Sequence, residues 1–130
     1  MRELTKYRLS VSFEQLQDSK SLLDNNSYKG SLNRSYYSIF TAIRALLAEK
    51  EIDYKKHSAV ISHFRLNYIK TGVFESKFSD YVGSVFEIRN NSDYADFFIA
   101  SREDAENQYS NAVEFYEAVK SYLESINDSV

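Results

Sequence analysis

The chain has 130 residues, a formal net charge of −3 and 43% hydrophobic side chains, enough to bury a core without disulfides or a structural metal. It has no cysteine, which excludes a disulfide framework and a thiolate metal site. The two histidines, His57 and His63, lack the spacing of a zinc-binding helix, so we expect no metal and no other cofactor. Without a run of about 18 apolar residues or an apolar leader, we expect a cytoplasmic protein with no membrane anchor.

The chain lacks the residues that usually mark β-turns. It contains no proline and only three glycines, whereas β-hairpins and sandwiches depend on such turn residues. Eleven tyrosines and nine phenylalanines must supply much of the bulk of the core. We therefore predict an all-α fold in which residues 1–130 form a single domain.

The first two predicted helices have regular apolar stripes. The first runs from about Glu3 to Asn25 and ends at a polar segment. The second starts near Tyr28, reaches Lys50 and carries the more regular stripe, with apolar side chains three and four residues apart, as on a buried helical face. The stripe of the first helix is formed by Leu9, Phe13, Leu16, Leu22 and Leu23. The stripe of the second is formed by Leu32, Tyr36, Ile39, Phe40, Ile43, Leu46 and Leu47.

A charged segment without periodicity, residues 51–57, is predicted to be a loop. Ser58 is a suitable N-cap for a third helix over residues 58–70. Gly72 follows that helix, where glycine often adopts the left-handed conformation. A fourth helix is predicted over about residues 75–91.

The last helix is predicted to start at Ser101, with Asp104 three residues later in a variant of the capping box. Apolar residues recur at helical spacing up to Ile126, and residues 127–130 are expected to fray. Four long helices and one short helix with brief connections predict an up-and-down helical bundle.

The charge is unevenly distributed along the chain. Residues 1–70 contain 12 Lys and Arg against 7 Asp and Glu, whereas residues 71–130 contain 4 against 12. The two parts of the chain can pair with each other or across a dimer. Alternatively, the basic part can bind an acidic partner such as RNA or a nucleotide.

The most concentrated polar stretch is residues 87–96, at the end of the fourth predicted helix. Arg89 and Asp93 are four residues apart, so they lie about 40° apart on one helical face. A structural ion pair of this kind stabilises a helix by only a few tenths of a kcal/mol. The alternative is that Arg89 belongs to a recognition or catalytic site.

Several segments, taken together and in order, resemble a known family. They are Ser35-Tyr36-Tyr37-Ser38-Ile39-Phe40, Ala45-Leu46-Leu47, Lys56-His57-Ser58-Ala59-Val60, Lys70-Thr71-Gly72 and Arg89-Asn90-Asn91-Ser92-Asp93-Tyr94. This order is similar to that of the small stand-alone HEPN proteins (higher eukaryotes and prokaryotes nucleotide-binding). The resemblance implies a helical bundle that forms a homodimer through the helices carrying the arginine motif. Many such proteins are metal-independent ribonuclease toxins, encoded beside a minimal nucleotidyltransferase that acts as the antitoxin.

The family motif is an arginine, often followed by a polar residue, with a histidine after four to six intervening residues. Arg89 matches the arginine and Asn90 the polar residue, but positions 94 to 96 contain no histidine. If the chain is an enzyme, Arg89 and Asn90 are the catalytic candidates. Asp93 and Tyr94 are weaker candidates for the missing proton carrier, because their ordinary pKa values of about 3.9 and 10 lie far from neutrality.

His57 can replace the missing histidine only if the fold brings its loop against Arg89 or across a dimer interface. The alternative is a histidine that packs at the start of the third helix. Tyr36 belongs to the apolar stripe and is expected in the core. The candidates for binding a nucleotide or an RNA phosphate are Arg34, Tyr37, Lys55, Lys56 and His57.

Three functional hypotheses follow from the residues and the resemblance. The first is a nucleotide- or RNA-associated interaction module of a two-gene toxin–antitoxin or defence system with a nucleotidyltransferase partner. The second is a metal-independent endoribonuclease toxin that uses Arg89 and Asn90. The third is a structural homodimer that binds no ligand.

Overall fold

The computed structural model describes residues 1–94 and 96–127, without the side chains of Asp93 and Tyr94. The described residues contain helices and connecting segments but no strand, which confirms the all-α prediction. Four helices are long and one is short, as predicted. The elements are α1 (Glu3–Asp24), α2 (Tyr28–Glu49), α3 (His57–Phe64), a π-helical segment η1 (Arg65–Ile69), α4 (Lys77–Tyr94) and α5 (Arg102–Asn127).

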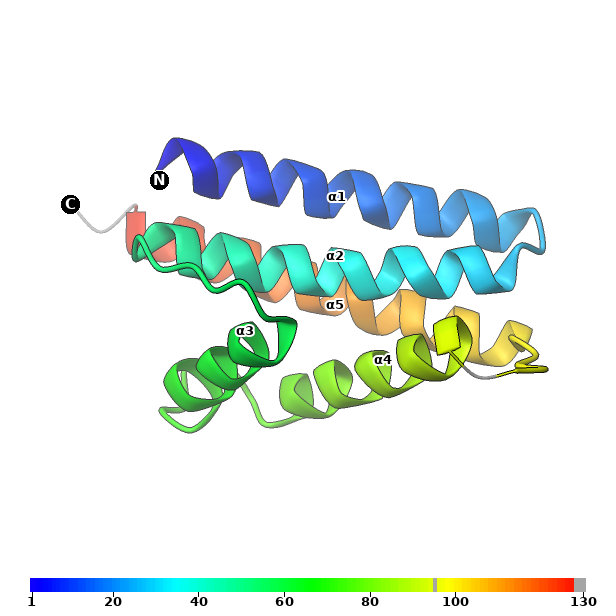
Figure 1. Ribbon diagram of the computed structural model, residues 1–130. Helices are drawn as coiled ribbons and strands as arrows, with labels where there is room; N and C mark the ends of the chain where they lie inside the picture. The colour runs from blue at the N-terminus through cyan, green and yellow to red at the C-terminus, as the bar shows by residue number, and fades with distance from the viewer. Residues whose placement is uncertain (95, 128–130) are drawn as a thin grey trace.

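Helix α2 lies at the centre of the bundle. In Figure 1, α1 lies along α2 in the opposite direction, while α3 and α4 lie on the other side of α2. Helix α2 also packs on α5. Four consecutive residues, Ala45, Leu46, Leu47 and Ala48, are all buried although successive side chains point about 100° apart around the helix. A helix that is apolar on most of its circumference is stable only when other elements surround it.

Small side chains let α1 approach α2 closely. Ser12 and Ser38 exchange buried hydrogen bonds, with Ser12 Oγ donating to the Ser38 carbonyl at 2.8 Å and Ser38 Oγ donating to the Ser12 carbonyl at 3.0 Å. One level along, Ser19 Oγ contacts the hydroxyls of Ser31 and Ser35 at 2.9 and 2.8 Å. These five residues, Ser12, Ser19, Ser31, Ser35 and Ser38, form the serine cluster. Its mutual hydrogen bonds satisfy hydroxyls that would otherwise be costly to bury.

The third helix differs from the prediction. It begins at His57, its N-cap is Lys56, and no side chain caps it. Ser58 was therefore wrongly predicted as the cap, because it lies one residue inside the helix. After Phe64 the chain continues as η1 rather than as a regular α-helix. Gly72 adopts a φ of 81°, which confirms the predicted left-handed conformation after this helix.

The ends of the last two helices are close to the prediction. Helix α4 continues to Tyr94, three residues beyond the predicted end. The Ser101 hydroxyl accepts a hydrogen bond from the Asp104 amide at 3.0 Å, which confirms Ser101 as the cap of α5. The predicted fraying of 127–130 falls almost wholly on residues 128–130, outside the described residues.

None of the described helices combines the length and apolarity that a membrane span requires.

Candidate functional site

Three elements bring Arg89, Tyr36 and His57 together. The guanidinium carbon of Arg89, on α4, lies 5.1 Å from the centre of the Tyr36 ring on α2, a distance typical of a cation–π contact. The Tyr36 hydroxyl is 2.8 Å from His57 Nδ1, at the start of α3. We call these three residues the Arg89–Tyr36–His57 cluster. The fold thus supplies a histidine close to Arg89, although none follows Arg89 at the family spacing.

The surroundings of His57 favour the neutral imidazole. The centre of its ring lies 4.1 Å from that of Phe40, and the side chain is half-buried. Burial lowers the pKa of His57, and the positive charges of Arg89 and Arg44 lower it further. A neutral ring can make this contact in either tautomer. It donates Nδ1–H to the Tyr36 oxygen and leaves Nε2 as an acceptor, or it accepts the Tyr36 hydroxyl hydrogen at Nδ1 and carries its own proton on Nε2. In the tautomer that donates Nδ1–H to Tyr36, neutral His57 can accept a proton at Nε2.

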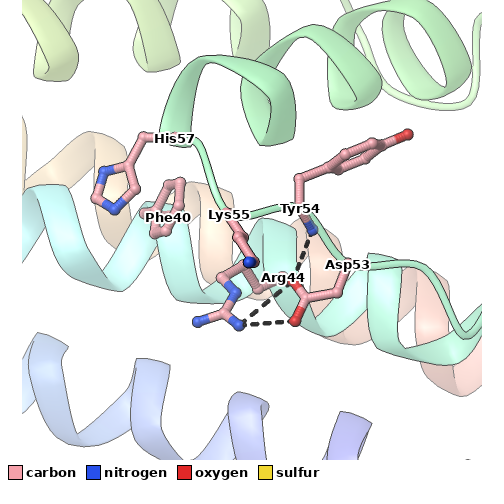
Figure 2. A pocket seen from close by; sticks show the side chains of 6 residues that line it. All are labelled: Phe40, Arg44, Asp53, Tyr54, Lys55 and His57. Carbon is pink, nitrogen blue, oxygen red and sulfur yellow. Dashed lines mark hydrogen bonds and ion pairs between the residues drawn. The ribbon is translucent and has the colours of Figure 1, made fainter.

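Next to this cluster lies a pocket of about 510 Å³, which we call the basic pocket. Figure 2 shows that two of its residues come from α2, one from the start of α3 and three from the loop between them. The volume lies in the range of small-ligand sites. The lining residues are Phe40, Arg44, Asp53, Tyr54, Lys55 and His57.

The structure brings together only part of the predicted site. His57 and Lys55 line the basic pocket. Arg89 is outside this lining and contacts Tyr36, which in turn contacts His57. Lys56 is exposed as the N-cap of α3 and does not line the pocket. Asn90, the residue after Arg89, is half-buried on α4 and is also outside this lining.

Arg34 and Tyr37 lie away from the pocket. Arg34 is exposed and donates a hydrogen bond to the neighbouring Asn33 side chain. The edge of the Tyr37 ring packs against Tyr36 at 5.0 Å, and Tyr37 is half-buried against the core. These contacts give Tyr37 a packing role beside Tyr36, and neither Arg34 nor Tyr37 lines the basic pocket. Their part in binding a ligand stays a prediction.

The predicted contributions of Asp93 and Tyr94 concern side chains outside the described residues. The predicted ion pair between Arg89 and Asp93 therefore stays a prediction. What the structure adds is the contact between Arg89 and the Tyr36 ring, which does not depend on Asp93.

Sequence reasoning missed the role of Tyr36 beside His57 and that of Arg44 in the pocket. A signal was present, because Tyr36, Phe40 and Arg44 are each four residues apart and therefore share one face of α2. The regular apolar stripe concealed it, since Tyr36 and Phe40 also belong to the core. That Asp53 would meet Arg44 could not be predicted, because the loop that carries Asp53 has no periodicity.

The chemistry available at this site is that of phosphate recognition. Arginine presents several donors in a planar fork that matches phosphate oxygens, and His57 can carry a proton beside it. Among the described residues, no three His, Asp or Glu side chains come together in a way that could hold a metal ion.

Comparison with known proteins identifies the family of the chain. The family model of the HEPN domain matches residues 5–122. A protein of Methanocaldococcus jannaschii named "Putative toxin MJ0142" is 32% identical over 97% of this chain and 85% of its own length. A UPF0332 protein of Thermotoga maritima is 30% identical over 87% of this chain and 86% of its own length. A second Methanocaldococcus jannaschii protein, "Putative toxin MJ0605", is 29% identical over 97% of this chain and 93% of its own length.

Proposed function

Because the chain belongs to the HEPN domain family, we propose that it is the HEPN component of a toxin–antitoxin or defence pair and binds RNA through the Arg89–Tyr36–His57 cluster. The toxin names of two relatives support the first part of this proposal. The geometry of the cluster supports the second. The partner protein we propose is a minimal nucleotidyltransferase, and the working form is a homodimer.

The observation that carries the proposal is the joining of Arg89 to His57 through Tyr36. The guanidinium lies over the Tyr36 ring, and the hydroxyl of the same ring contacts the imidazole at 2.8 Å. Tyr36 is buried, with an exposed fraction of 1%. Its fixed position in the core therefore restrains the side chains of Arg89 and His57 that contact it. A preorganised arginine of this kind binds phosphate at a low conformational cost.

A second candidate function, metal-independent endoribonuclease activity, is favoured by the position of His57. In this reaction, the 2′-hydroxyl of RNA attacks the adjacent phosphorus, loses its proton, and expels the 5′-oxygen of the next nucleotide. Arg89 would stabilise the charge on the phosphate oxygens. His57, neutral because its pKa is lowered, would accept the proton of the 2′-hydroxyl at Nε2 while its Nδ1–H is donated to the Tyr36 oxygen. It would then give this proton to the departing 5′-oxygen.

The first experiment compares wild type and Arg89→Ala for binding and cleavage of a fluorescein-labelled single-stranded RNA in the presence of EDTA. We expect binding to weaken by about tenfold or more in Arg89→Ala, because a charge-assisted contact to phosphate is lost. The matched control is Arg102→Ala, since Arg102 is an exposed arginine that pairs with Glu106 on α5. Equal binding by wild type and Arg89→Ala would contradict the proposed site.

Cleavage separates the two candidate functions. If wild type cleaves and His57→Ala does not, while both bind RNA, the enzyme hypothesis is supported and His57 is the proton carrier. If the protein binds RNA without cleaving it, the interaction module is supported. Cleavage that persists in Arg89→Ala would come from a contaminating nuclease.

A structural homodimer without a ligand is the competing interpretation of Arg89. It predicts that Arg89→Ala shifts the protein towards monomer in analytical ultracentrifugation and that wild type binds no RNA. The proposed function predicts RNA binding by wild type. An adjacent nucleotidyltransferase gene, together with growth inhibition that this gene relieves, would support the two-component system.

A further inference from the structure

The basic pocket contains more positive than negative charge. Arg44 and Lys55 line it, and Asp53 is its only carboxylate. Arg8, on α1, reaches the same carboxylate from the neighbouring side, with its Nη2 3.6 Å from Asp53 Oδ2. Two arginines therefore contact the Asp53 carboxylate, and Lys55 adds a third positive charge to the pocket. This excess of positive charge favours an anionic ligand.

Asp53 orients Arg44 but occupies only part of the hydrogen-bond donors of the Arg44 guanidinium. The Arg44 Nη2 lies 3.4 and 3.3 Å from the two Asp53 carboxylate oxygens, longer than well-formed N–H···O hydrogen bonds. Only this nitrogen of Arg44 contacts Asp53. The loop amide of Tyr54 holds the carboxylate at 2.9 Å. Arg44 is thus oriented from one side and keeps donor capacity for another acceptor.

Arg8, on α1, adds positive charge next to Arg44 and Asp53. Its side chain is only 11% exposed, and its Nη1 donates to the Arg44 carbonyl at 3.0 Å. Burial and the charge of Arg44 lower the pKa of Arg8. Two arginines therefore share one carboxylate at the edge of the bundle, an arrangement that a bound anion would stabilise.

The basic pocket and the Arg89–Tyr36–His57 cluster share His57. The ring lines the pocket and contacts Tyr36 through Nδ1. Along α2, Tyr36 and Arg44 are eight residues apart, or about 12 Å at 1.5 Å per residue. A ligand that contacts both ends must extend along α2, as a single RNA strand does with its successive phosphates.

We infer that the basic pocket is a second phosphate-binding site, in which Arg44 and Lys55 contact an RNA phosphate further along the same strand than the one at Arg89. This inference rests on the proposed RNA binding and specifies its ligand as a single strand with at least two phosphates. Arg44 supplies directed donors and Lys55 supplies a mobile point charge. Arg8 and Asp53 position Arg44 and do not touch the RNA.

The test measures the salt dependence of binding with a short fluorescein-labelled oligouridylate in EDTA. For single strands, log K falls with log salt, and the magnitude of this negative slope decreases by about 0.7 for each phosphate contact removed. We expect Arg44→Gln to weaken binding about tenfold at low salt and to reduce the slope by about 0.7. Lys55→Gln should reduce the slope by a similar amount with a smaller loss of affinity, because lysine makes a less directed contact.

Lys29→Gln is the matched control, because Lys29 is an exposed lysine in the first turn of α2. The salt-dependence slope of RNA binding by this variant should equal that of wild type. Lys55 is exposed, so Lys55→Gln keeps the inference falsifiable even if Arg44→Gln fails to fold. Uridine monophosphate should compete weakly, since it offers one phosphate. Competition as strong as that of the oligouridylate would overturn the two-phosphate site.

The outcomes separate this inference from the proposed function. If Arg89→Ala loses RNA binding while Arg44→Gln and Lys55→Gln keep the wild-type affinity and slope, the RNA site stands and the second phosphate site is wrong. If wild type binds no RNA, the proposed function fails and the inference fails with it.

Discussion

Two polar clusters on opposite sides of α2 differ in charge and in burial. Between α1 and α2, the serine cluster is fully buried and neutral, and its hydroxyls bond to one another and to backbone carbonyls. Beside α3 and α4, the Arg89–Tyr36–His57 cluster joins two ionisable side chains to one buried tyrosine and opens to the basic pocket.

The difference indicates which polar groups serve the fold and which are available for a ligand. Mutually satisfied neutral groups let two helices pack closely and need nothing from outside. An excess of positive charge at the edge of the bundle adds little to stability by itself, but attracts an anion. We therefore expect substitutions in the serine cluster to change stability, and substitutions around His57 mainly to change RNA binding.

The largest effect on stability is expected from Ser19→Val. Its bulk must fit where Ser31 and Ser35 approach within 3 Å, and it leaves their hydroxyls without the Ser19 partner. Overpacking and unsatisfied polar groups should together lower the free energy of unfolding by about 3 kcal/mol, measured by urea denaturation. The control Ser10→Val, at an exposed position of α1, should cost less than about 1 kcal/mol. A Ser19→Val protein as stable as wild type would mean that the helices are not closely packed here.

A smaller effect on stability is expected from Tyr36→Phe. This variant tests whether the Tyr36 hydroxyl contributes to stability, to RNA binding or to both. The phenyl ring keeps the aromatic surface beneath Arg89 and loses only the hydroxyl that contacts His57. The free energy of unfolding should fall by about 1 kcal/mol, the value of one hydrogen bond. RNA affinity should fall less than in Arg89→Ala. Tyr7→Phe, with an exposed hydroxyl-bearing ring, is the control and should change neither quantity. A loss of affinity equal to that in Arg89→Ala would show that the hydroxyl itself is essential for binding.

The smallest effect is expected from pH, and it should have opposite signs for stability and binding. The folded pKa of His57 lies below its usual value, so the unfolded chain binds the proton first as the pH falls. The free energy of unfolding should decrease from above pH 6.5 down through the folded pKa. A bound phosphate favours the charged imidazole, so RNA affinity should increase over the same range.

His57→Gln tests this pH dependence, because glutamine does not titrate. Its stability and its RNA affinity should vary less with pH than those of wild type over the same range. The carboxylates of Glu49 and Asp53, whose pKa values are lowered, titrate at more acidic pH and leave this window undisturbed. An unchanged pH profile in His57→Gln would assign the effect to another group.

Most of the fold could be predicted from the sequence because helical periodicity is a local property. The stripe from Leu32 to Leu47 predicted α2 within one residue at its end, and Ser101 predicted the start of α5. The start of α3 was wrong by one residue, because no side chain caps it. The π-helical segment η1 was not predicted, since it depends on packing rather than on a local pattern.

By itself, the sequence determined the all-α class and the extent of α2, because helical periodicity depends on neighbouring residues in the chain. It also named Arg89 as a candidate, through the order of segments shared with the family. Only the tertiary structure decided that His57 would meet Tyr36 beneath Arg89, and that Asp53 would position Arg44. Both contacts depend on the path of the loop between α2 and α3. The position of Arg89 over Tyr36 depends in addition on the rotation of α4 about its own axis, which the packing of the whole bundle fixes.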